Sequence, residues 1–432
     1  MTWPAAAAPP DGDVEPVEEF RARARAWIAG NLPRSDPARL HLPAYRITAG
    51  TEEEELAEVD RNRRLQRLLW DGGFAGICFP REYGGLGLTP EHQRAFNAET
   101  TGYETPALIQ VPTFVPCAAV LLDFGTEEQK RRHIPAMLRG EEIWMQFLSE
   151  PSGGSDVAGA LTTALRDGDD WILNGSKIWT TGAWYADYGL CLVRTNWDVP
   201  KHRGLTVFIV GVRQPGVELH RIEMIDGNRE FCQEFLTDVR VPDSNRVGEV
   251  DDGWTVGTRW MFHERNAMGG GSPYVTGVRH GNVEAPTGAD RLIDVARRAG
   301  RLGDPRVREL VGGHAVLARA QIALTRRVAT GVQLGRLPDS ATALTRLMSA
   351  EVEQRRLDVA LEIAGPAAAG GEPGELFHAG TEYLLRQQAS IGGGTTEMAR
   401  NNVAERMLGM PREHNPYTNV PFRDVPKGPP GA

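Results

Sequence analysis

The chain contains 432 residues, with 48 lysines and arginines against 57 aspartates and glutamates, which gives a formal net charge of −9. This acidic balance argues against binding to nucleic acid or to an anionic membrane, and the lack of an uninterrupted run of 18 apolar residues predicts no membrane span. Hydrophobic residues make up 41% of the chain, enough for a sizeable core, and the length predicts about two to three domains.

Four cysteines lie far apart in the sequence, at Cys78, Cys117, Cys191 and Cys232. This spacing argues against a zinc site or a disulfide framework and predicts a cytoplasmic protein. The glycine fingerprints of dinucleotide-binding folds and P-loops are both missing, and the histidines have no metal-ligand spacing. We therefore expect chemistry without a metal ion.

Helical periodicity dominates the first third of the chain. Residues 1–16 are predicted to be a disordered tail, and residues 17–140 an N-terminal helical domain. Apolar residues recur at helical spacing over 18–28 and 52–69, and Thr89-Pro90 marks the start of a further helix.

The pattern changes over residues 141–250, where short runs of β-branched and aromatic residues alternate with turn signals. The predicted strands are 161–165, 171–173, 188–195, 205–212 and 233–241. So many short strands predict a small antiparallel barrel or sandwich. Helices return over 251–412, at 254–268, 288–300, 307–333, 341–363 and 395–408, and residues 413–432 are predicted to be a loose tail. The fold class is therefore α+β.

Two segments of the β region combine turn chemistry with polar side chains. The first, residues 147–156, reads FLSEPSGGSD, a strand end that enters a loop able to approach a ligand closely; a plain surface turn is the alternative. The second, residues 174–182, reads NGSKIWTTG and places Trp179 and Thr181 on one face of a strand, which suits a flat cofactor with polar edges. Core packing of Trp179 is the alternative.

Two further segments lie in the helical region. Glu264 and Arg265 interrupt an apolar helix, which indicates either acid–base chemistry or a solvated charged face. Residues 391–397 read IGGGTTE, three glycines before a threonine-capped helix; exposed amides there favour an anion or a carbonyl group, and a loop without a ligand is the alternative.

In this order, and together with PREYGGLG at 80–87 and AERMLGMPR at 404–412, these segments resemble the acyl-CoA dehydrogenase family over residues 18–412. The resemblance implies an N-terminal helical domain, a middle antiparallel β domain, a C-terminal four-helix bundle and bound FAD. It also assigns site residues to this chain: FAD contacts at Gln146, Leu148, Ser149, Trp179, Thr181, Thr395 and Glu397, and a contact of Ser155 with the CoA portion of the substrate.

The implied reaction is α,β-dehydrogenation of an acyl-CoA thioester to a trans-2-enoyl-CoA. A carboxylate takes the α-proton, the β-hydride passes to flavin N5, and the electrons leave to an electron-transfer flavoprotein or a similar acceptor. Many members carry the catalytic glutamate at the position of Gly393, whereas Glu264-Arg265 matches the placement in the isovaleryl and long-chain branches. The resemblance therefore implies Glu264 as the base, Arg265 on the CoA side, and the N–H of Gly393 as a donor to the thioester oxygen.

Several alternatives stay open at this stage. For Glu264, the alternative is a structural residue in a salt bridge. For the whole protein, the alternatives are a flavin monooxygenase of the same fold and a partner subunit of a heteromeric dehydrogenase. The stretches 298–303 and 362–365 only faintly match the family's pyrophosphate-binding stretches, so Arg298 and Arg301 are both candidates for that contact. This divergence resembles that of actinobacterial relatives acting on branched or sterol-derived thioesters. The expected assembly is a homodimer or homotetramer, or a heterotetramer, in fatty acid or sterol side-chain metabolism.

Overall fold

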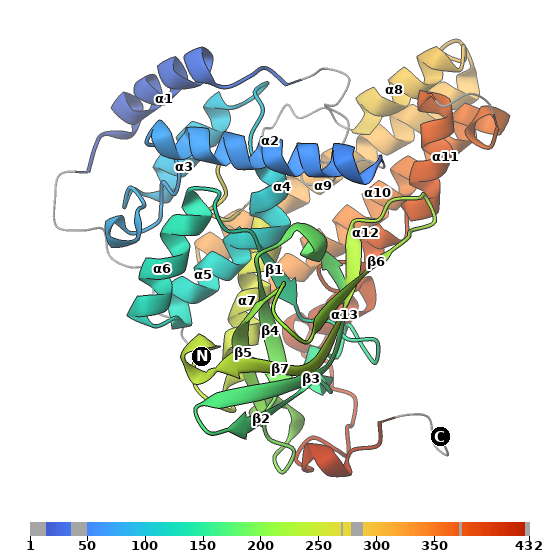
Figure 1. Ribbon diagram of the computed structural model, residues 1–432. Helices are drawn as coiled ribbons and strands as arrows, with labels where there is room; N and C mark the ends of the chain where they lie inside the picture. Colours follow the sequence, from blue (N-terminus) through green and yellow to red (C-terminus); the bar gives the residue numbers. More distant parts are fainter. Residues whose placement is uncertain (1–13, 36–49, 269–270, 278–287, 371–373, 428–432) are drawn as a thin grey trace. The chain divides into compact units, whose positions relative to one another are not determined.

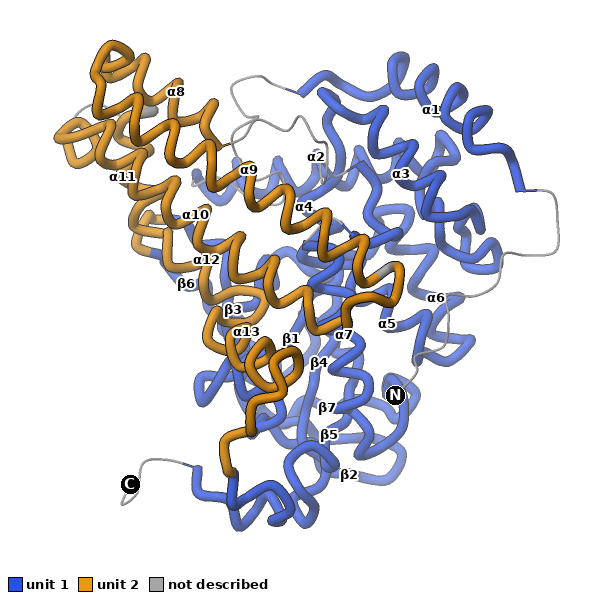
Figure 2. Tube along the Cα trace, turned by 180° about the vertical axis from the view of Figure 1, so that it is seen from behind, with its two compact units in different colours: residues 1–224, 228–280, 415–432 blue, residues 225–227, 281–414 orange. Residues whose placement is uncertain are grey.

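The computed structural model describes residues 14–35, 50–268, 271–277, 288–370 and 374–427 (Figure 1). They form two compact units, which Figure 2 shows in blue and orange. Unit 1 comprises residues 1–224, 228–280 and 415–432, and unit 2 comprises residues 225–227 and 281–414. Positions 1–13 and 428–432, parts of the two predicted tails, lie outside the described residues.

The helices of unit 1 begin and end where the local sequence dictates. Thr51 and Glu54 form a capping box at the start of the second helix, in which the Thr51 N–H donates to Glu54 Oε2 at 2.8 Å. Thr89 and Pro90 start the third helix, as predicted. The bounds are α1 Val17–Asn31, α2 Glu52–Asp71, α3 Pro90–Glu99, α4 Ala107–Ile109, α5 Val115–Phe124, α6 Glu127–Leu138 and α7 Gly253–Met268.

One segment is an exception to the expectation that no part of the chain is long and apolar enough to span a membrane. Ala107–Phe124, which runs from α4 through a π-helical turn into α5, is long and apolar enough by length and composition to cross a membrane. The expectation counted only uninterrupted apolar runs, and Gln110 and Thr113 interrupt this one. Of the 18-residue window, 83% is buried inside the structure, so we assign the segment to the core of unit 1.

The strands of unit 1 form one sheet in the order β6-β7-β3-β2-β4-β5-β8, with β1 paired to β4. Most pairs are antiparallel, as predicted, but β4 pairs in parallel with both β1 and β2. The bounds are β1 Trp144–Phe147, β2 Thr163–Asp167, β3 Asp170–Thr181, β4 Tyr188–Arg194, β5 Leu205–Gly211, β6 Val217–Ile222, β7 Phe231–Pro242 and β8 Arg246–Val247. The strand end expected before the 147–156 loop is β1, whereas the sequence did not predict β6 and β8, because they are short or have few buried residues.

Helix α7 joins the sheet to the N-terminal helices. It packs against α5 and against β4 and β5, and its residues Val256, Trp260 and Ala267 are buried in the core of unit 1. The C-terminal helical domain predicted from residue 251 therefore begins with a helix, α7, that belongs to unit 1. The residue singled out as the base, Glu264, is therefore held by unit 1.

Unit 2 is helical. Its core contains Leu292, Val307, Val359 and Ile363, which come from α8, α9 and α10, with Ala379 of α11 packed against them. The bounds are α8 Gly288–Arg298, α9 Pro305–Gln333, α10 Thr342–Ala364, α11 Glu375–Leu385, α12 Gln388–Ile391 and α13 Thr396–Asn402. The helix predicted over 395–408 divides into α13 and a π-helical turn at Val403–Met407.

The end of the chain differs from the predicted loose tail. Residues 415–427 belong to unit 1, and the side chain of Phe422 is only 4% exposed. The frequent prolines and glycines indicated a lack of regular structure correctly, but an irregular segment can still bury an aromatic ring against a neighbouring surface.

Candidate active site

The loop after β1 is fixed through its backbone. The carbonyl of Leu148 accepts a hydrogen bond from Lys177 Nζ at 3.3 Å, and the carbonyl of Ser149 accepts one from the Ile178 N–H at 2.9 Å. Both donors belong to β3, the strand that continues to Trp179 and Thr181. The structure therefore brings together two segments, FLSEPSGGSD and NGSKIWTTG, that are separate in the sequence.

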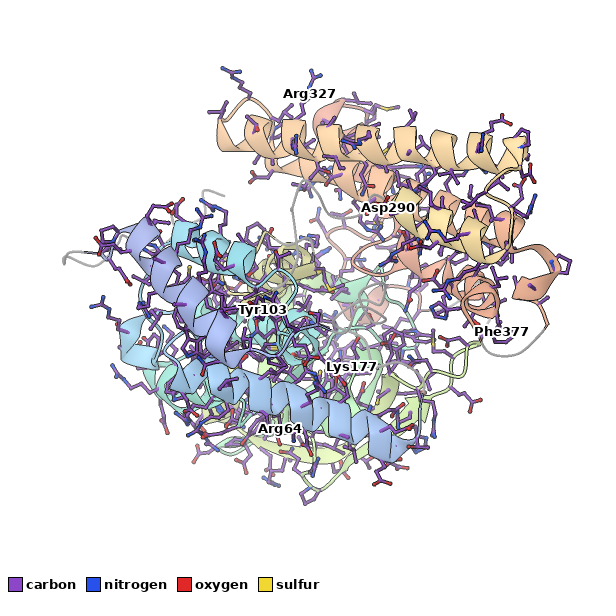
Figure 3. All side chains as sticks on the ribbon, turned by 90° about the horizontal axis from the view of Figure 1, so that it is seen from above. Arg64, Tyr103, Lys177, Asp290, Arg327 and Phe377 are labelled. Carbon is purple, nitrogen blue, oxygen red and sulfur yellow. The ribbon has the colours of Figure 1, made fainter. Side chains whose placement is uncertain are left out.

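A buried ion pair lies behind this loop. Lys177 Nζ, labelled in Figure 3, is 2.8 Å from Glu150 Oε1, and the Lys177 side chain is 0% exposed. The Glu150 carboxylate also accepts from the N–H groups of Leu161 and Thr162, at 2.6 and 3.0 Å. Burial by itself would raise the pKa of Glu150, but Lys177 and these donors together hold the pKa below its ordinary value. Both residues stand in the quoted segments, yet sequence reasoning gave neither a role.

Trp179 occupies an irregular position in β3. Its φ is +66°, and the β3–β7 register shifts between Ile178 and Thr180, which indicates a β-bulge. Trp179 is 52% exposed, and its ring meets the Phe231 ring edge to face with the ring centroids 5.9 Å apart. A positive φ is unfavourable for a bulky residue, and such strain tends to persist at functional sites. Core packing, the alternative considered from the sequence, is excluded by the exposure of the ring.

Thr181 lies two positions further along β3 and is half-buried, whereas Thr180 between them is buried. Trp179 and Thr181 therefore share one side of the strand, as predicted, although the bulge interrupts the strict period of two.

Thr180 points to a second buried carboxyl group. Its Oγ1 donates to Glu234 Oε2 at 2.9 Å, and Glu234, on β7, is 0% exposed. Within the described part of the chain, Glu234 Oε1 has no hydrogen-bond partner. Burial raises the pKa of Glu234 to about 8, although Thr180 and Lys177 act in the opposite direction. Lys177 is already paired with Glu150, so among these three buried groups two carboxyl groups share one ammonium group, and Glu234 keeps its proton at neutral pH.

We expect Glu234→Gln to change the pH dependence of stability. An ordinary glutamate ionises near pH 4.3, so between about pH 4.3 and pH 8 the folded protein holds a proton that the unfolded chain has lost. Stability of the wild type therefore falls with rising pH in this window, by about 1.4 kcal/mol per unit, and the variant lacks this term. From pH 5 to pH 8, the free energy of unfolding of the variant should therefore increase by about 3–4 kcal/mol relative to that of the wild type, which thermal unfolding at both pH values measures. Glu223→Gln, at an exposed position, is the control; a pH-independent difference for Glu234→Gln would contradict the buried proton.

Gln146 has both ends of its amide engaged with protein groups. Its Nε2 donates to the carbonyl of Pro112 at 2.9 Å, and its Oε1 accepts from Trp260 Nε1 at 2.6 Å. The side chain thereby links β1, the π-helical turn before α5, and α7. The predicted FAD contact of Gln146 stays a prediction; in the structure its amide connects β1 to α7 through Trp260.

Glu264 lies on α7 one residue after a firm anchor. His263 Nε2 is 2.8 Å from Asp123 Oδ2, and Arg259 Nε donates to the same oxygen at 2.6 Å, which fixes α7 to the end of α5. Glu264 itself is half-buried, and within the described residues its carboxylate has no ion pair and no hydrogen bond. Burial raises its pKa, and the positive charge of Arg265 offsets this only in part. A salt-bridged structural role, the alternative left open by the sequence, does not match this environment.

Ser155 and Arg265, the two predicted substrate contacts, are both exposed. Ser155 lies in the loop that follows Glu150, and Arg265 lies on α7 directly after Glu264. Their exposure leaves both side chains accessible to a ligand in solution.

The remaining predicted residues belong to unit 2. Gly393 and Gly394 have φ values of +71° and +96°, a region that favours glycine, and Thr395 Oγ1 accepts from the Met398 N–H at 3.1 Å as the N-cap of α13. Glu397 lies exposed in the first turn of α13. The threonine cap predicted from the sequence is therefore present.

Arg346 of α10 holds the glycine loop in place. Its guanidinium donates to three backbone carbonyls, those of Ala389, Gly392 and Gly394, at 2.7, 2.8 and 3.2 Å. Sequence reasoning missed this residue, because an arginine 46 positions before Gly392 gives no local signal.

Arg301 connects the two stretches that faintly match the pyrophosphate-binding pattern. It donates to the carbonyls of Glu362 and Ile363 at 3.0 and 3.1 Å and pairs with Asp304 at 2.7 Å. The structure therefore brings 298–303 and 362–365 together within unit 2.

Comparison with protein families identifies three consecutive matches. Residues 45–141 match the acyl-CoA dehydrogenase N-terminal domain, residues 146–239 the middle domain, and residues 251–408 the C-terminal domain. These matches correspond in order to the helical, sheet and helical parts of the fold.

Individual relatives extend over nearly the whole chain. The chain is 32% identical to acyl-CoA dehydrogenase IpdE1 of Mycobacterium tuberculosis, with 93% of this chain and 99% of the relative covered. It is similar to the solved structure of the Tcur3481-Tcur3483 steroid ACAD, with a TM-score of 0.69, 27% identity, and 93% and 99% of the two chains covered. It is also similar to the ChsE4-ChsE5 complex from Mycobacterium tuberculosis, with a TM-score of 0.68, 25% identity, and 94% and 100% covered.

Three domain matches in the family's order, and a relative above 30% identity along almost the full length, establish the relationship that the sequence segments indicated. This chain belongs to the acyl-CoA dehydrogenase family and is an oxidoreductase of that family.

Proposed function

We propose that this chain catalyses FAD-dependent α,β-dehydrogenation of an acyl-CoA thioester to a trans-2-enoyl-CoA, with Glu264 as the base. The observation that carries this proposal is the environment of Glu264, a half-buried carboxylate without an ion pair among the described residues, on a helix anchored one residue earlier at His263. Burial raises its pKa toward the operating pH, which improves a carboxylate as a general base. The position that holds the base in many relatives is Gly393, which has no side chain to compete for this role.

The residues of unit 1 fit an FAD ring. A strained bulge presents the exposed ring of Trp179, Thr181 offers a hydroxyl on the same side, and the backbone of Leu148 and Ser149 is fixed nearby along β3. We propose that these four residues hold the isoalloxazine, and that Thr395 and Glu397 provide further FAD contacts. A flavin held by these residues would supply the hydride acceptor of the reaction, at its N5 atom.

The protein residues supply the remaining chemistry. An α-proton is far too weakly acidic for an ordinary carboxylate to remove, so the thioester oxygen must be stabilised by fixed donors, and we assign the N–H of Gly393 to this role. Ser155 and Arg265 are proposed to bind the CoA portion. Desolvation of Glu264 makes its carboxylate a stronger base than a solvated one.

The substrate and partners follow from the comparisons as part of this proposal. One structural relative bears the name Tcur3481-Tcur3483 steroid ACAD, and another is a ChsE4-ChsE5 complex. We propose a branched fatty or sterol-derived acyl-CoA as substrate, an electron-transfer flavoprotein or a similar acceptor, and a cytoplasmic location. A heteromeric assembly with a second chain is the favoured alternative to a homodimer or homotetramer.

Anaerobic titration of the purified chain with straight-chain, branched and sterol-side-chain acyl-CoAs tests this function. We expect the oxidised-flavin absorbance to bleach with at least one thioester. A yellow protein that no thioester bleaches would contradict dehydrogenation and favour the monooxygenase alternative. A colourless protein that gains FAD only when co-expressed with a second chain would favour the partner-subunit role.

Trp179→Asn separates the function of this ring from its structural effect. Asparagine tolerates a positive φ better than tryptophan, so we expect unchanged or higher thermal stability of the FAD-free protein. Loss of the aromatic plane should weaken FAD binding about tenfold, the effect of roughly 1.4 kcal/mol. Fluorescence titration with FAD and thermal unfolding measure the two effects. Leu165→Asn, at an exposed position of β2, is the control; equal FAD affinity in all three proteins would remove Trp179 from the site.

A further inference from the structure

The end of the chain forms a strap on unit 1, which we define as residues 421–427. The N–H of Phe422 donates to the carbonyl of Val199 at 2.9 Å, and the N–H of Arg423 donates to the carbonyl of Trp197 at 3.0 Å. The Phe422 ring stacks on Trp197 with ring centroids 5.4 Å apart, and Lys427 Nζ lies 5.1 Å from the centroids of both rings. An ion pair between Arg423 and Asp198 adds a polar contact at the rim.

The main contact of the strap is with a buried arginine. The guanidinium carbon of Arg194 lies 3.8 Å from the centroid of the Phe422 ring, and Arg194 is 0% exposed. A guanidinium is weakly hydrated and stacks well on aromatic faces, so the ring replaces water on one face of this cation. Burial lowers the pKa of Arg194 to about 10, which agrees with a desolvated position.

The N–H groups of the same guanidinium hold the loop after Ser155. Arg194 Nη2 donates to the carbonyl of Ala158 at 2.6 Å, and its Nε donates to the carbonyl of Ala160 at 3.0 Å. Lys201 adds a second link, because its Nζ binds Asp156 at 2.7 Å and its carbonyl accepts from Arg194 Nη1 at 3.2 Å. A continuous set of contacts therefore runs from Phe422 through Arg194 to residues 156–160.

We propose that the strap positions the substrate loop, residues 153–160, and that Phe422 acts as a positioning residue for CoA-thioester binding through Arg194. The assignment of Ser155 to the substrate rests on the proposed function, whereas the strap's hold on the loop rests on the contacts above. The family's C-terminal domain match ends at residue 408, so the strap lies outside the matched domains. A loop held in its binding conformation before the substrate arrives loses less conformational entropy on binding.

The test compares Phe422→Ala with Tyr417→Ala, which removes an exposed ring from the same terminal segment. A chain ending at His414 removes the whole strap. Hydrogen–deuterium exchange of the 153–160 segment in the substrate-free holoprotein reports on the loop directly, because the Gly159 N–H donates within the loop to the Asp156 carbonyl at 2.8 Å. The kinetic constants are then measured with the acyl-CoA that bleaches the flavin best.

For Phe422→Ala and the shortened chain, we expect faster exchange in 153–160, with exchange in β7 and FAD content unchanged. The KM should rise about tenfold with kcat unchanged, and Tyr417→Ala should match the wild type. Unchanged exchange in both strap variants would overturn the proposal, and so would faster exchange with an unaltered KM. If the wild type bleaches with no thioester while exchange still rises in the strap variants, the proposed function fails and the strap's control of the loop stands.

Discussion

Glu264→Gln is expected to slow flavin reduction by acyl-CoA about 100- to 10,000-fold, the usual contribution of a positioned general base. Glutamine has nearly the same shape and cannot accept the α-proton. Because the Glu264 carboxylate has no ion pair or hydrogen bond among the described residues, the substitution leaves no partner without its counterion. FAD content and folding should therefore be unchanged. Anaerobic stopped-flow measurement of flavin bleaching gives the rate directly.

The control for this variant is Glu249→Gln, at a side chain that is 87% exposed in the loop before α7. Wild-type rates are expected for it. Bleaching at the wild-type rate in Glu264→Gln would move the base to another residue and leave the family assignment intact.

The pH dependence of the wild type gives a second measure of the same group. Proton abstraction needs the ionised carboxylate, so kcat/KM should rise with pH and level off above the pKa of Glu264 in the free enzyme. Since burial raises this pKa, the rise should occur above the pH at which an ordinary glutamate ionises, near 4.3. A profile that is already level at pH 5 would contradict the desolvated position of Glu264.

Lys177→Met is expected to destabilise the protein by about 3–5 kcal/mol, because it leaves the Glu150 carboxylate buried without its cation. The variant also removes the donor to the Leu148 carbonyl, so FAD should bind more weakly to whatever folded protein remains. Thermal unfolding and FAD titration measure the two effects.

The double variant Lys177→Met/Glu150→Gln separates the charge from the packing. With both charges removed, the penalty for an unpaired buried ion disappears, and most of the lost stability should return. If the double variant is as unstable as Lys177→Met alone, the loss comes from packing and not from the buried charge.

The local sequence was sufficient to predict features that depend on residues close together in the chain. Three helices start at a threonine. Thr51 and Thr395 each accept a hydrogen bond from an N–H group in the first turn, and Thr89 bonds to the His92 side chain there. The shared side of Trp179 and Thr181 follows from the period of a strand. The segments that resemble the acyl-CoA dehydrogenase family are also local in sequence, and their order alone indicated the family that the domain matches establish.

Other features depend on burial, which a charge pattern by itself does not reveal. The sequence singled out Glu264 by resemblance, but it did not show how the environments of Glu150, Glu234 and Glu264 differ. The fold pairs the first with Lys177, leaves the second protonated beside Thr180, and places the third half-buried without an ion pair among the described residues. Three side chains of the same chemical type thus serve as a structural ion, a neutral hydrogen-bonding group and a candidate base, because desolvation and neighbouring charges set the pKa of each one.

Contacts between distant positions were the other part that only the tertiary structure decided. Gln146 and Trp260 are 114 positions apart, and the sequence gives no sign that their side chains meet. The ring of Phe422 reaches Arg194 from a segment whose composition indicated only a loose tail. The sequence by itself indicated most helices, most strands and the family, and it proposed the candidate site residues. Only the tertiary structure decided which carboxylate is unpaired and what holds the substrate loop, because burial and long-range contacts exist only once the chain has folded.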